Sequence, residues 1–101
     1  MTKEAHEGSL PGQELVEQGL ADLAQGRITE FSLLVLIAAP RLRRLRMDIP
    51  DRPFPRPLEH HLYARLEERL GTAAHSHYSG LLRRIASYAR ALEREQRDSS
   101  N

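Results

Sequence analysis

Apolar residues recur every three or four positions along most of this chain, which is the spacing of one face of an α-helix. The first such stripe covers residues 12–25 and ends at Gly26, a residue suited to the left-handed turn that closes a helix. A second helix is predicted over 30–46, with Thr29 as its N-cap. Its residues 31–39 are apolar on almost all sides, so we expect this helix to be the central buried element.

Prolines interrupt the pattern in two places. Pro40 predicts either a kink or a restart of the second helix, because proline lacks the backbone N–H that a helix interior needs. The segment 49–57 holds four prolines, which excludes a helix and predicts an extended crossing between two helical halves. Ile49 and Phe54 are expected to fix this segment to the core.

A long helical arm is predicted after the prolines, over residues 58–70 and 72–95. The stripe keeps its phase across Gly71, so the pattern fits both one continuous helix and two nearly collinear helices, with a break at Gly71 and Thr72 as the new N-cap. A continuous arm would be about 57 Å long. A compact domain of this length is only about 26 Å across. Its own chain could not cover such an arm, which predicts self-association, as a two-fold dimer.

The fold class that follows is all-α: a small bundle of roughly three to five helices with a long C-terminal helical arm and a proline-rich crossing segment. A single helical domain is expected over residues 10–97, between a flexible tail over 1–9 and a frayed end over 98–101. The arm's apolar stripe is the expected interaction face, formed by Leu66, Leu70, His77, Leu81, Ile85, Tyr88 and Leu92.

Composition narrows the class of protein. The 101 residues allow one domain, and the absence of Cys excludes a disulfide framework, a thiolate zinc site and a Cys nucleophile. The longest apolar run is far shorter than the about 20 residues that span a membrane. The N-terminus lacks the apolar region of a signal peptide. We therefore expect a cytoplasmic protein with no membrane partner.

Arginine supplies nearly all of the positive charge, and Arg41, Arg43, Arg44 and Arg46 cluster near the end of the second helix. Such a ridge would neutralise phosphates, so nucleic-acid binding is the alternative function. The net charge of only +1 and the lack of interleaved aromatic residues favour instead a solvated face, or a partner for the acidic first helix.

The motifs of most enzyme classes are absent. Neither GxGxxG nor a P-loop nor GxSxG occurs, so no nucleotide cofactor and no nucleophilic serine are predicted. The neighbouring histidines are not three or four residues apart, as two metal ligands on one helical turn would be. No metal site and no catalytic residue are therefore predicted from His60, His61, His75 and His77.

A candidate polar site is formed by Arg69, His75 and His77. Arg69 and His75 fit the loose R-x4–6-H spacing of HEPN ribonucleases, but about two such matches are expected by chance among this many Arg and His. A HEPN-like or metal-dependent hydrolase is thus the third interpretation. The leading one is a small helical protein without catalytic activity that acts as an interaction or assembly module, with a second copy or another protein as its partner.

Overall fold

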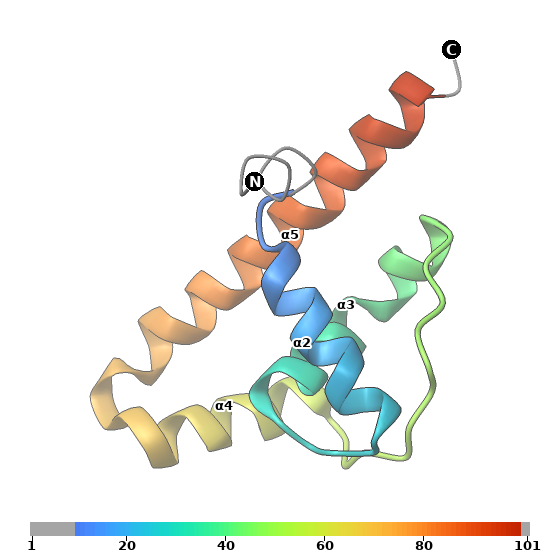
Figure 1. Cartoon of the computed structure of the whole chain (residues 1–101). Coiled ribbons are helices and arrows are strands. Elements are labelled where there is room, and N and C mark those ends of the chain that lie inside the picture. The colour runs from blue at the N-terminus through green and yellow to red at the C-terminus, as the bar shows by residue number, and fades with distance from the viewer. Residues whose placement is uncertain (1–9, 100–101) are drawn as a thin grey trace, which may run out of the picture.

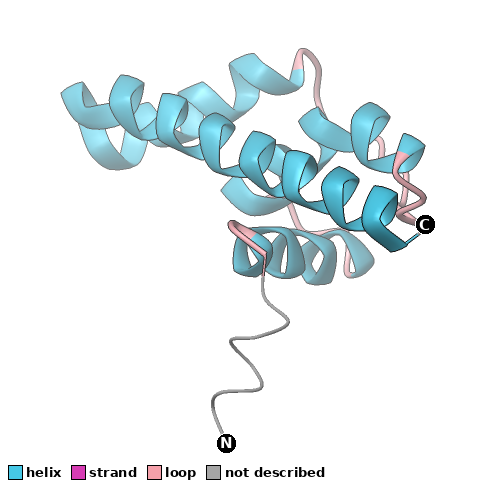
Figure 2. Cartoon of the chain, turned by 90° about the horizontal axis from the view of Figure 1, so that it is seen from above, coloured by secondary structure: helices cyan, strands magenta, loops and turns pink. Residues whose placement is uncertain are grey.

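The computed structural model of the chain describes residues 10–99 (Figure 1). The helices are α2 (Gln13–Ala24), α3 (Glu30–Arg44), α4 (Leu58–Leu70) and α5 (Ala74–Ser99), with a 3-10 turn η1 (Gly71–Ala73) before α5. This part of the chain holds helices and loops and no strand (Figure 2), which confirms the all-α prediction. The predicted tail over 1–9 lies outside the described residues. Of the end predicted to fray, residues 98 and 99 belong to α5, and residues 100 and 101 lie outside the described range.

The helices α2 and α3 cross with their backbones close together (Figure 1). Gly19 lies buried in α2 at this crossing. A Cβ atom added to it would overlap Val35 Cγ2 and lie 2.6 Å from the backbone oxygen of Phe31. Only a residue without a side chain permits this approach, so Gly19 sets the distance between the two helices.

A buried polar network fixes the link between α2 and α3. The carboxylate of Asp22, a residue only 3% exposed, accepts hydrogen bonds from Thr29 at 2.7 Å, Arg27 at 2.9 Å and Gln18 at 3.1 Å. Thr29 is also the N-cap of α3, as predicted, because its hydroxyl oxygen accepts the Ser32 backbone N–H at 3.0 Å. The Ser32 hydroxyl in turn accepts the Thr29 N–H at 2.8 Å. The network therefore satisfies the buried carboxylate and the start of α3 together.

The central element is α3, which contacts α2, α4 and α5. It continues through Pro40, so the predicted restart is wrong; the proline ring lies exposed and the helix ends at Arg44 rather than at residue 46. The apolar run predicted to be buried, residues 31–39, supplies most of the core side chains of α3. The buried apolar residues of α3 are Leu33, Leu34, Val35, Leu36, Ala39 and Leu42.

The proline-rich segment 49–57 crosses from α3 to α4 without forming a helix. Ile49 and Phe54 are buried, as predicted, and attach the segment to the core. Arg52 adds a polar attachment, because its guanidinium donates to the backbone oxygens of Leu23 at 2.8 Å and Ala24 at 3.1 Å. These carbonyls lie in the last turn of α2, where the Leu23 oxygen also accepts the Gly26 backbone N–H at 3.0 Å.

The C-terminal arm is present but bent at Gly71 (Figure 1). Gly71 has a positive φ of 58° and ends α4, and η1 leads directly into α5. Thr72 lies within η1 and α5 begins at Ala74, so the prediction of Thr72 as an N-cap is wrong. A straight helix over the whole arm would need about 60 Å. The longest dimension of the described chain is 44 Å, so the arm is helical from residue 58 to residue 99 but is not straight. Figure 2 shows α5 running along the length of the molecule, and both arms of the bend contact α3.

Candidate binding surfaces

The predicted interaction face lies mostly inside the core of a single copy. Four of its members are buried: Leu66, Leu81, Ile85 and Tyr88. Leu70 and Leu92 are partly exposed, and His77 is exposed. The premise that the chain cannot cover its own arm is therefore wrong. The bend at Gly71 lets α4 and α5 pack against α3, and the buried members of the stripe stabilise this packing.

Two of the four arginines of the predicted ridge form contacts within the chain. Arg43 donates two hydrogen bonds, at 3.2 Å and 2.8 Å, to a backbone oxygen at the start of the proline-rich segment. Arg41 forms an ion pair with Glu93 of α5 at 3.6 Å. Arg44 and Arg46 are exposed and form no ion pair with any residue in the described range. Among the four cations, Arg41 is the one with an ion pair inside the described range, and nucleic-acid binding through the ridge stays a prediction.

The structure does not bring Arg69, His75 and His77 together. Arg69 donates two hydrogen bonds to Glu30, at 2.7 Å and 2.8 Å, and so ties the end of α4 to the start of α3. The ring of His75 lies 6.4 Å from that of Tyr63, and His77 is exposed. Within residues 10–99, no group of three or more His, Asp or Glu side chains could hold a metal ion.

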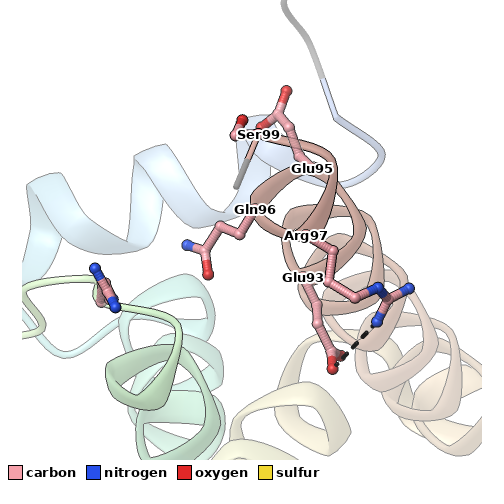
Figure 3. A pocket seen from close by; sticks show the side chains of 6 residues that line it. Glu93, Glu95, Gln96, Arg97 and Ser99 are labelled. Carbon is pink, nitrogen blue, oxygen red and sulfur yellow. Dashed lines mark ion pairs between the residues drawn. The ribbon is translucent and has the colours of Figure 1, made fainter. Parts of the chain in front are cut away.

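A hollow of about 580 Å³ lies at the end of α5, beside Arg46 (Figure 3). Glu93 and Arg97 form an ion pair across it at 3.7 Å. The Gln96 side chain donates to the backbone oxygen of Leu45 at 2.6 Å and connects α5 to the end of α3. Acidic and basic groups thus neutralise each other here, and the hollow presents no single charge to a ligand.

A second hollow, of about 510 Å³, lies between α4 and α5, and we call it the α4–α5 hollow. Aromatic and acidic side chains dominate its wall, which is lined by Glu59, His60, Tyr63, Ala64, Glu67 and Tyr78. The rings of Tyr63 and Tyr78 meet edge to face, with centroids 5.3 Å apart and planes at 84°. This is a favourable geometry for an aromatic pair, so each ring fixes the orientation of the other.

The α4–α5 hollow carries uncompensated negative charge. Glu59 and Glu67 are exposed, and neither forms an ion pair with another part of the described chain. Burial, and then the negative charge of Glu59, raises the pKa of Tyr78 above its ordinary value of 10.0. The phenol therefore stays neutral at physiological pH, and the carboxylates of Glu59 and Glu67 supply the negative charge of the hollow.

Sequence reasoning missed this hollow, although part of its signal was present. Glu59, Tyr63 and Glu67 are spaced four residues apart, which places them on one face of α4. Tyr78 is on the following helix and reaches Tyr63 only because the chain bends at Gly71. The bend could be expected at that glycine, but the pairing of the rings could not.

None of the helices in the described part of the chain is both long enough and apolar enough to cross a membrane. Comparisons with family models, with curated proteins and with solved structures found no match to this chain. The assignment of a function therefore depends on the surface residues themselves.

Proposed function

We propose that the protein is a non-enzymatic protein-interaction module that contacts its partner through the α4–α5 hollow. The observation that carries the proposal is the pair of partly exposed tyrosine rings beside two carboxylates that the described chain does not neutralise. Tyrosine is enriched in protein interfaces, because its ring buries a large apolar area while its hydroxyl reaches a polar partner.

The α4 wall of the hollow is also preorganised by contacts within the chain. Buried Leu58, Leu62 and Leu66 anchor α4 in the core, and the ion pair between Arg69 and Glu30 fixes its end. A surface that is already ordered loses little conformational freedom on binding, which leaves more of the contact energy for affinity. This favours a binding role for side chains that would otherwise only be solvated.

Affinity capture with the immobilised full chain tests the proposal, with extract of the cells that make the protein as the source of partners. The variant with Tyr63→Ala and Tyr78→Ala is expected to lose a partner that the wild type retains, whereas Tyr63→Phe with Tyr78→Phe keeps the rings and retains it. Phe31→Ala removes a partly exposed ring elsewhere and serves as the matched control. The captured protein is then purified and its affinity for each variant is measured directly.

Capture that is equal for the wild type and the double alanine variant would contradict the proposal, provided that circular dichroism shows both to be folded. A second copy of the chain is one candidate partner, although the buried stripe gives it no support. Light scattering over a range of concentrations tests it: a mass that rises in the wild type but not in the double alanine variant identifies the second copy as the partner.

A further inference from the structure

We propose that the α4–α5 hollow receives one Lys or Arg side chain of the partner, with its cationic group over the tyrosine rings and between Glu59 and Glu67. This inference rests on the proposed function and specifies the chemistry of the partner. It follows from the combination of a defined hollow, an oriented aromatic pair and two carboxylates on the same wall.

The arrangement along α4 places a ring between two negative charges. Glu59 lies one turn before Tyr63 and Glu67 one turn after it, so the three side chains share a face. The face of a tyrosine ring attracts a cation through its quadrupole, and the carboxylates add direct attraction and hydrogen-bond acceptors. A neutral apolar side chain would use the rings alone and leave both carboxylates without a partner.

The cations of α4 itself lie elsewhere. Arg65 and Arg69 line a separate hollow beside Glu30, on the side of α4 that faces the α2–α3 link. They are absent from the wall of the α4–α5 hollow, whose volume of about 510 Å³ falls within the range of ligand sites, roughly 300–1,000 Å³. The hollow thus has both the space and the charge for a cation that another molecule supplies.

Nuclear magnetic resonance of the full chain tests this chemistry with small probes. N-acetyl-arginine amide and N-acetyl-lysine amide are titrated, and N-acetyl-citrulline amide serves as a neutral probe with nearly the shape of arginine. The chain has three Tyr and no Trp, so the ring signals of Tyr63 and Tyr78 are observed beside that of buried Tyr88. We expect saturable shifts at Tyr63 and Tyr78, with the arginine probe bound about tenfold more tightly than the citrulline probe.

Charge-removing variants locate the site of binding. The variant with Glu59→Gln and Glu67→Gln is expected to lower the affinity for the arginine probe about tenfold. Glu68→Gln with Glu95→Gln removes the same charge outside the hollow and should leave the affinity unchanged. An equal loss in both variants, an equal affinity for the citrulline probe, or no saturable shift with either cation would each overturn the inference.

Failure of this inference can be distinguished from failure of the proposed function. A partner whose capture requires Tyr63 and Tyr78 but tolerates Glu59→Gln with Glu67→Gln would leave the interaction module in place and overturn the role of the cation. Capture that depends on neither pair would overturn both proposals.

Discussion

The two helix pairs of this protein are held together by different means. The α2–α3 pair brings backbones together at Gly19 and satisfies the buried carboxylate of Asp22 with three donors. The α4–α5 pair meets through the partly exposed rings of Tyr63 and Tyr78, and the carboxylates beside them find no cation within the described chain. The first pair thus satisfies its buried carboxylate internally, whereas the second leaves two carboxylates available for the partner that we propose.

Glycine substitutions give the largest expected contrast between the two pairs. Gly19→Ala should lower the free energy of unfolding by about 3 kcal/mol, because its new methyl group would overlap Val35 and the Phe31 backbone. Chemical denaturation of the purified chain measures this change.

Gly80→Ala is the matched control in α5. Its Cβ would lie 4.0 Å from the Arg83 guanidinium and meet no closer side chain, so no group has to move. Alanine should therefore raise the free energy of unfolding by about 0.5–1 kcal/mol through its helix propensity. Losses of the same size at both positions would show that the two pairs are packed equally tightly, and the comparison would fail.

Removing the charge at the α2–α3 link is expected to have the next largest effect. Asp22→Asn should lower the free energy of unfolding by about 2 kcal/mol at neutral pH, because an amide cannot accept from all three donors. Burial alone would raise the pKa of Asp22, but hydrogen bonds from Thr29, Arg27 and Gln18 outweigh it and lower the pKa below its ordinary value of 3.8.

The sign of the pH dependence follows from that lowered pKa. A carboxylate with a lowered pKa in the folded state stabilises the protein fully above its unfolded pKa, and this contribution disappears as the pH falls through the folded pKa. The stability difference between the wild type and Asp22→Asn should therefore shrink below about pH 4. A difference that stays constant into that range would mean that the Asp22 network is not what joins the two helices.

Local rules predicted most of the helices. The cap at Thr29, the buried apolar run of α3 and the glycine at residue 71 each depend on a few neighbouring residues, and the structure confirms these features. Gly19 and Asp22 were overlooked, because a small and an acidic residue do not count as members of an apolar stripe. Both nevertheless lie on the buried face of α2. Gly19 packs against α3, and Asp22 accepts hydrogen bonds from the segment that joins α2 to α3.

The candidate site was less predictable than the fold. An apolar stripe that keeps its phase across Gly71 fits a straight arm and a bent arm equally well, and the local pattern does not decide between them. Packing against α3 selects the bent arm, which buries Leu81 and Ile85 and places Tyr78 against Tyr63. The hollow that we propose as a binding surface therefore depends on tertiary packing, which the local sequence pattern does not determine.

The smallest expected effect concerns the electrostatics of the α4–α5 hollow. Glu59→Gln should lower the pKa of Tyr78 toward its ordinary value, because the negative charge of Glu59 disfavours the tyrosinate; burial, the larger cause, keeps the pKa raised. A pH titration of the tyrosine ring signals measures the shift. Tyr88 serves as the internal control. Its pKa is raised by burial and by the charges of Glu17 and Glu95, which this substitution does not change. An unchanged Tyr78 titration would mean that Glu59 does not act on the hollow, and the α4–α5 pair would lose half of the charge that distinguishes it from the α2–α3 pair.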